Sequence, residues 1–406
     1  MSGLRGVWVT AVNNIEIASD RKYTSIILLA TTIAIYVHGV GMLPAVSSRV
    51  EVGIVVLFLV VAGITAATFE SGFELHLSTG TAFPLIIISI LVIIQTTRGL
   101  VIGNPPVHVV GDSLKLLVLI AFCLSTAQLN ISELIQTLQL GVLFTVFGIC
   151  LKAVFIPQND ITFLATGTVS LIPAVILLRP KWAGQYLYSA LVATFFIVGF
   201  LTMSRLIWIG IIGTAVYSLL LLTYRQGMSG ELVVLLFVTV LLSVLFISIN
   251  PWAIDTIVTE IQATISVGAS IQGRILEAEI VLNSWRQNKL LGGGLGATIP
   301  VKEAFAKLFA EYTVMDRFHF IHSAYLVLLY RIGIVGLGAY LLLLIRGLRV
   351  TTVVALTGSE WRVAGACGAV ILFGIVAGLV STYPIGIASG AIGGIIFGAV
   401  DVISRT

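Results

Sequence analysis

Long apolar runs recur along almost the whole chain, and each is close to the length of a membrane-spanning helix. Of the 406 residues, 58% are hydrophobic and only 10% are charged, whereas about a quarter of the residues in a soluble domain carry charge. A helix needs about 20 apolar residues to cross a bilayer. The sequence therefore predicts an all-α fold, a polytopic transmembrane helical bundle with about 12 spans. The runs lie at about 24–43, 50–69, 82–97, 112–129, 132–154, 160–178, 184–202, 204–224, 231–250, 321–345, 362–382 and 385–402.

The basic residues between these runs favour one orientation in the membrane. With a cytoplasmic N-terminus, ten Lys and Arg residues fall in cytoplasmic segments and five fall in or near the short external loops. Cytoplasmic loops of membrane proteins are enriched in Lys and Arg. We therefore expect a multi-pass protein with both termini in the cytoplasm.

Residues 250–320 form the one connection long enough to be a small subdomain, and this orientation places it outside the cytoplasm. We expect three parts: an N-terminal transmembrane bundle of about nine spans (1–249), this external loop subdomain (250–320), and about three C-terminal spans (321–406). Helical spacing within residues 272–286 puts Arg274, Ala278, Val281 and Trp285 on one face. Residues 301–317 have an apolar stripe, which predicts a helix that lies on the membrane or caps the spans. The pattern does not distinguish a fixed cap from a gate.

Several familiar site motifs are excluded by their context. The glycine-rich stretch at residues 291–297, LGGGLGA, fits a dinucleotide-binding pattern, but it follows a helical stretch rather than a strand. We expect its glycines to allow tight turns or to expose amide groups to an anion. The chain has no HExxH motif, and we expect His38, His76 and His108 to be scattered, satisfied or interfacial side chains. The three cysteines lie in apolar runs. We therefore expect neither a metal nor another cofactor.

Three groups that can carry positive charge are placed by this topology at one level outside the membrane. Arg205 stands at the outer mouth of the eighth predicted span, Arg274 begins the loop helix, and His322 stands at the mouth of the tenth. Two permanent cations and a titratable imidazole suit the binding of a diphosphate and the movement of a nearby proton. Arginine at a membrane mouth also serves as an interfacial anchor, which is the alternative for Arg205.

These motifs, in this order, resemble the O-antigen ligase family, whose superfamily also contains lipid-linked O-antigen polymerases. The resemblance covers about residues 200–345. It is carried by Ser204-Arg205, Arg274 with Trp285, Gly292, Gly294, Gly296, His322, Tyr325, Leu326, Gly333 and Gly336. The family's usual pattern has Asn after the histidine, where this chain has Ser323.

The resemblance implies a GT-C-like glycosyltransferase of the bacterial inner membrane, with its active site facing the periplasm. It implies metal-independent, inverting transfer of an undecaprenyl-diphosphate-linked glycan to the lipid A–core. Arg205 and Arg274 would hold the diphosphate, and His322 would serve the acceptor hydroxyl. Supporting roles would fall to Ser204, Trp285, Gly294, His319, Ser323 and Tyr325.

Two other functions stay open at this point. A polymerase would pass the glycan to another lipid-linked repeat. Such enzymes often have a second sizeable external loop with its own arginine, whereas residues 95–111 are short and carry Arg98 alone, which favours a ligase. A transporter or flippase would use charges within the spans, and the candidates are Lys115 and Arg331. Arg331 could pair with an acid from a neighbouring span or extend outward.

Overall fold

A computed structural model describes residues 77–139, 176–178, 205–227, 269–300, 317–319, 321–380 and 387–406. Its helices are α4 (Thr79–Val101), α5 (Pro106–Ala127), α10 (Arg205–Gln226), α13 (Ala269–Trp285), α15 (Ala324–Thr357), α16 (Trp361–Val380) and α17 (Ile387–Ile403). Two short antiparallel strands, β1 (Ile299–Pro300) and β2 (Arg317–Phe318), join the loop to the segment before α15. The all-α prediction is confirmed for this part of the chain. The count of about twelve spans and the GT-C-like topology extend beyond the described residues.

The described helices coincide with six of the predicted apolar runs. Among the described residues, α4, α5, α15 and α16 up to Leu379 are long and apolar enough to cross a membrane, and α17 contains a shorter apolar stretch. The runs at 362–382 and 385–402 match α16 and α17 to within a few residues. The amphipathic helix predicted for residues 301–317 lies almost wholly outside the described residues, and its last residue, Arg317, belongs to β2.

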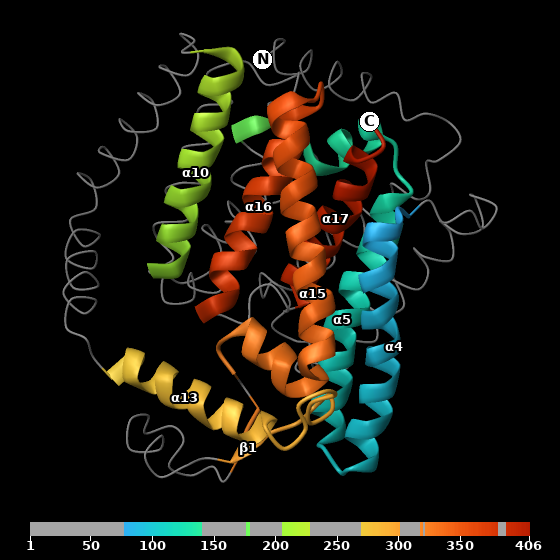
Figure 1. Ribbon diagram of the computed structural model, residues 1–406, viewed down its shortest axis with the longest axis vertical. Helices are drawn as coiled ribbons and strands as arrows, with labels where there is room; N and C mark the ends of the chain where they lie inside the picture. Colours follow the sequence, from blue (N-terminus) through green and yellow to red (C-terminus); the bar gives the residue numbers. More distant parts are fainter. Residues whose placement is uncertain are drawn as a thin grey trace, which may run out of the picture.

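Close helix packing in the bundle depends on small residues. α17 lies against α5 (Figure 1), and a Cβ added to Gly398 would come 2.5 Å from the carbonyl oxygen of Cys123 in α5. A Cβ added to Gly390, near the start of α17, would come 3.0 Å from the carbonyl oxygen of Lys115. Small residues at such interfaces let two backbones approach, which is how apolar helices pack when there is no hydrophobic drive to associate.

The helices define two ends of the bundle. At the end that we call the tail end, Arg225 near the end of α10 donates to the carbonyl oxygens of Leu356 and Gly358. Ser78, before α4, bonds there to Asp401 near the C-terminus. The opposite end, which we call the loop end, holds α13, residues 286–300 and the start of α15 (Figure 1).

Two features at the loop end position the site. α15 is kinked at Gly333, whose φ is 73°, so its first part is inclined to the longer remainder (Figure 1). α10 spans about 33 Å at 1.5 Å per residue. Because Arg225 lies at the tail end, α10 runs from there toward the loop end, and Arg205 is the residue at its far end.

Candidate functional site

A buried carboxylate holds His322 from two sides. One oxygen of Glu277, Oε2, lies 2.6 Å from the imidazole Nδ1 of His322. The other, Oε1, accepts the backbone N–H of the same residue at 2.6 Å. The Glu277 side chain is 3% exposed and that of His322 is 26% exposed. The ring is therefore fixed at its base and still reached from outside.

Glu277 reaches this position because α13 buries one of its faces. The helix runs from Ala269 to Trp285, close to the predicted 272–286. Its most buried residues are Gly273, Glu277, Ile280 and Val281. This face is displaced by about one residue from the predicted face, which began at Arg274. Arg274 consequently lies at the edge, 40% exposed, with Nη1 3.7 Å from Oε2 of Glu277.

The electrostatics of this pair suit proton transfer near neutral pH. Burial raises the pKa of Glu277 to about 7, and the positive charge of Arg274 acts in the opposite direction. A neutral imidazole that donates its Nδ1 proton to a carboxylate carries its lone pair on Nε2. Such a ring is equipped to act as a general base, with the carboxylate stabilising the imidazolium that forms.

The other predicted site residues differ in how closely they relate to this pair. Ser323 caps α15 by accepting from the Leu326 N–H, and its hydroxyl donates to the Gly378 carbonyl. Tyr325 donates to the carbonyl of Ile375, and the Trp285 indole donates to that of Lys289. All three anchor the surrounding backbone. Ser204 lies outside the described residues.

The glycine loop, residues 291–297, is a backbone connector. Gly292, Gly294 and Gly296 all have positive φ, as the tight-turn prediction required. Every amide from Gly292 to Ala297 donates to a protein oxygen: those of Asn288, Tyr330, Arg331, Gln95, Asp112 and Gly294 in turn. One of these amides, that of Gly296, thus meets an anionic group of the protein, the Asp112 carboxylate, and the others meet carbonyl oxygens. The loop joins α4, α5 and the kink of α15.

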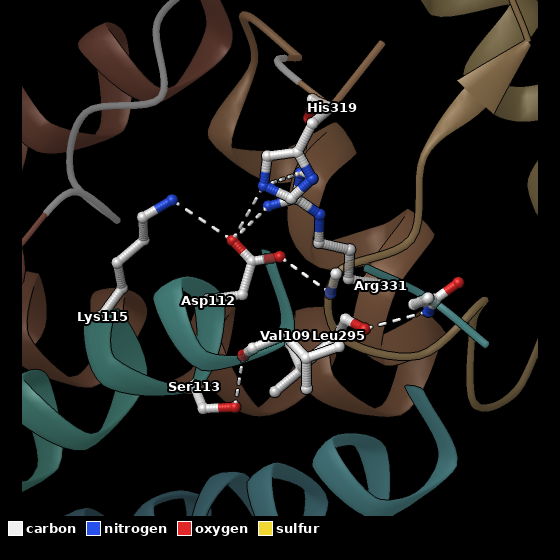
Figure 2. A network of polar contacts seen from close by, with 9 residues as sticks. Val109, Asp112, Ser113, Lys115, Leu295, His319 and Arg331 are labelled. Carbon is white, nitrogen blue, oxygen red and sulfur yellow. Dashed lines mark hydrogen bonds and ion pairs between the residues drawn. The ribbon is translucent and has the colours of Figure 1, made fainter. Parts of the chain in front are cut away.

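A second buried carboxylate, Asp112 of α5, organises the other side of the loop end (Figure 2). Its Oδ1 accepts Nη1 of Arg331 at 2.7 Å and Nζ of Lys115 at 3.2 Å. The same oxygen lies 3.5 Å from Nε2 of His319. Its Oδ2 accepts the Gly296 amide at 3.0 Å. Arg331 thus pairs with an acid from a neighbouring helix, which resolves the alternative that the sequence left open.

The histidine predicted to be scattered, His108, belongs to this second cluster. Its ring stacks on that of His319, with centroids 3.9 Å apart and planes 9° from parallel. The prediction that His108 stands apart was wrong because α5 begins at Pro106 and carries it to the segment before α15. Within the described residues no group of three His, Cys, Asp or Glu side chains is arranged to hold a metal ion. That the chemistry needs no metal stays a prediction.

Sequence reasoning missed both carboxylates. Glu277 follows Arg274 by three residues, so the predicted helix alone would have placed the two side chains together. Asp112 and Lys115 have the same spacing at the start of a predicted span, where an ionisable residue is by default a candidate functional group. Their partners, in contrast, are 45 and 219 residues away in the chain.

Comparison with known proteins gives one family. Residues 189–341 match the family model described as O-antigen ligase. The match spans α10, α13, the glycine loop and the first part of α15, and it contains Arg205, Arg274, Glu277 and His322. No curated protein matches the sequence.

Proposed function

Since residues 189–341 match the O-antigen ligase family model, we propose that this chain is an O-antigen ligase of the bacterial inner membrane. It transfers a glycan from undecaprenyl diphosphate to the lipid A–core at the periplasmic face, without a metal and with inversion at the anomeric carbon. The family match itself supports glycan transfer of the ligase or polymerase type in a membrane protein. The choice of ligase, the acceptor and the mechanism are our proposal.

The observation that carries this proposal is the Glu277–His322 pair beside Arg274. Glu277 fixes both the ring and the backbone of His322 through two bonds of 2.6 Å. In our mechanism the Nε2 lone pair of His322 takes the proton of the acceptor hydroxyl as that oxygen attacks the anomeric carbon. Glu277 then stabilises the imidazolium, which lowers the free energy of the transition state.

Negative charge grows at the same time on the leaving lipid diphosphate. We assign its stabilisation to Arg274 and Arg205, because a planar guanidinium bonds phosphate oxygens bidentately and keeps its charge at all relevant pH values. Arg274 lies against Glu277, and Arg205 begins the helix whose N-terminal end is directed toward this end of the bundle. Attack from the His322 side, opposite the departing diphosphate, inverts the anomeric centre.

The short loop between α4 and α5 supports ligase over polymerase. Arg98, in the last turn of α4 just before this loop, donates to the side chain of Asn288 at 2.9 Å, and Asn104 in the loop donates to the carbonyl of Leu295 at 3.0 Å. Both side chains thus tie this loop to the glycine loop and the residues just before it. These contacts disfavour a second external loop that offers its own arginine to a second lipid diphosphate.

The experiment that tests the proposal is deletion of the gene followed by complementation with wild type or with His322→Ala. Lipopolysaccharide is resolved on a gel, and the glycan on the lipid carrier is sized in parallel. A ligase deletion gives bare core with long chains accumulating on undecaprenyl diphosphate. A core carrying a single repeat would instead identify a polymerase. We expect His322→Ala to lower transfer by about 10³-fold or more, and a normal ladder from this variant would refute the assignment of the base.

Arg274→Lys tests the diphosphate role separately. Lysine keeps the charge but loses the bidentate fork, so we expect turnover to fall by about 10²-fold. The matched control is Arg286→Lys, which changes an exposed arginine just after α13 that bonds to Asn283 and should leave turnover unchanged. Full activity in Arg274→Lys would contradict bidentate binding.

A further inference from the structure

One face of α5 carries a row of ionisable residues at the loop end. His108, Asp112 and Lys115 are spaced i, i+4 and i+7, which puts them on the same side of a helix. Arg331 and His319 contact this row from the α15 side (Figure 2). The function proposed above uses none of these five side chains.

Positive charge exceeds negative charge in this cluster. Asp112 and Arg331 form an ion pair with 2.7 Å between Oδ1 and Nη1, with side chains 3% and 5% exposed. That pair is already neutral, and the second carboxylate oxygen accepts the Gly296 amide. Lys115, whose side chain is 33% exposed, thus adds a positive charge beside an ion pair that is already neutral. A partly buried charge is costly unless an opposite charge compensates it, which points to an anion from outside.

Two stacked imidazoles lie beside this cation, and one of them, His108, adds a hydrogen-bond donor. Both His108 and His319 are partly exposed, and their rings are parallel at 3.9 Å. Two imidazolium rings so close would repel each other. Burial also lowers the pKa of His319, which favours its uncharged ring, and the ring nitrogens of His319 already contact Asp112 and Arg331. An ammonium beside the N–H of an uncharged imidazole suits a phosphate group.

The location of the cluster indicates which phosphate it would meet. His319 precedes His322 by three residues, a distance of at most about 10 Å along the chain. The segment between them has Glu277 and Arg274 on its α13 side, and Asp112 and Lys115 on its α5 side. A transfer between two lipid-borne substrates needs a place for each anionic head group, and the α13 side is assigned to the donor.

We propose that Lys115, together with His108 as it stacks on His319, binds a phosphate group of the acceptor lipid. This inference rests on the proposed glycan transfer and adds a second anion site to it. The phosphate is either a substituent of the lipid A–core or, for a polymerase, the diphosphate of a second lipid-linked glycan. The chemistry of recognition is the same in both cases.

The first test measures transfer by the purified full-length protein with donor and acceptor varied separately. Lys115→Met keeps most of the side-chain volume and removes the charge. We expect it to raise the acceptor KM about tenfold, the effect of losing one charge-assisted contact, with kcat and the donor KM within about twofold. Lys115→Arg should restore the acceptor KM to within about threefold. Lys289→Met, an exposed lysine at the loop end, is the matched control and should change neither constant.

The second test changes the acceptor and begins with the wild-type protein. Removing the phosphates of a lipid A–core acceptor should raise its KM for the wild-type protein to the value that Lys115→Met shows with the intact acceptor. The same removal should have no further effect on Lys115→Met, because the contact is already lost. Offering a second lipid-linked glycan as acceptor tests the other source of phosphate, and a KM that depends on Lys115 for either acceptor supports the site.

Three results would overturn the inference. They are an unchanged acceptor KM in Lys115→Met, a change confined to the donor KM, or an equal loss on dephosphorylation with and without Lys115. Each of these leaves the proposed function standing as long as the wild-type protein transfers glycan and His322→Ala does not. Absence of any transfer by the wild-type protein would instead refute the proposed function.

Discussion

Two buried carboxylates, Glu277 and Asp112, face the same short segment of chain, His319 to His322, and they differ in how their oxygens are used. Asp112 takes donors from Arg331, Lys115, His319 and the Gly296 backbone. Both oxygens of Glu277 bond to His322, and Nη1 of Arg274 lies 3.7 Å from Oε2. A carboxylate surrounded by permanent donors is locked in its ionised form. A carboxylate paired with an imidazole can share a proton with it. We therefore interpret Asp112 as a structural anchor and Glu277 with His322 as the reactive pair.

We expect the largest effect on stability from a substitution of Asp112, the structural anchor. In Asp112→Asn the buried Arg331 loses its counter-charge, which costs about 3–5 kcal/mol when one partner of a buried ion pair is removed. Thermal unfolding of the purified protein in detergent should show a strongly lowered midpoint. Glu277→Gln serves as the comparison and should unfold near the wild-type temperature. Equal stability of all three proteins would show that the two carboxylates do not differ in this way.

Glu277→Gln should instead lower activity. We expect kcat to fall by about 10²-fold, because the amide cannot accept the Nδ1 proton and stabilise the imidazolium as a carboxylate does. Wild-type transfer should decline as the pH falls through about 7, where Glu277 becomes protonated. In the variant this decline should move to lower pH, because the imidazolium has lost its carboxylate partner.

The matched control for this pH profile is Glu279→Gln, which changes an exposed glutamate on the same helix. Its kcat and pH profile should equal those of the wild type. A profile for Glu277→Gln that coincides with the wild type would remove Glu277 from the mechanism.

Gly296→Ala tests the close packing of the glycine loop on α5, which carries Asp112. The residue has a φ of 76°, and an added Cβ would lie 2.6 Å from the Val109 backbone nitrogen. We expect a loss of at least about 1–3 kcal/mol in stability. Gly103→Ala has a similar φ of 82° but open space around it, so it should lose only the part due to strain, about 1 kcal/mol. Equal losses would mean that close packing on α5 contributes nothing.

The smallest effect is expected at Ser323. Ser323→Ala removes the cap of α15 and the bond to Gly378, which we expect to cost about 1 kcal/mol. Transfer should stay within about threefold of wild type, because Glu277 rather than Ser323 orients the imidazole. Ser323→Asn should keep the cap and regain most of the stability. A large loss of kcat in Ser323→Ala would assign part of the orientation to this hydroxyl.

The helices could be predicted from apolar length, but their ends could not. The predicted run at 321–345 stops before Arg346, whereas α15 continues to Thr357. Arg346 is tolerated within the bundle because it bonds to Thr81 and lies 3.5 Å from Asp401. Likewise α5 begins at Pro106 rather than at 112, and proline at the first helical position was the available signal.

The side chains to which we assign chemical roles were singled out in the sequence, but most of their partners were not. His322 and Arg274 were identified by their motifs, and Arg205 by its place at a span mouth. Glu277 and Asp112 became evident only in three dimensions, because the apolar pattern does not indicate which helix face meets a residue far away in the chain. The predicted division at residues 249/250 and 320/321 stays a proposal.

The glycine loop also has a consequence for how the protein is made. Its amides bond to backbone oxygens in α4, which is synthesised earlier, and in α15, which is synthesised later. The loop therefore cannot complete its contacts until α15 has left the ribosome and inserted. Glu277 and His322 lie on either side of this loop, so a nascent chain holds the acid without its imidazole. Under the proposed mechanism, catalytic competence accordingly arises in one late step of biogenesis, and we expect a chain arrested before α15 to be inert.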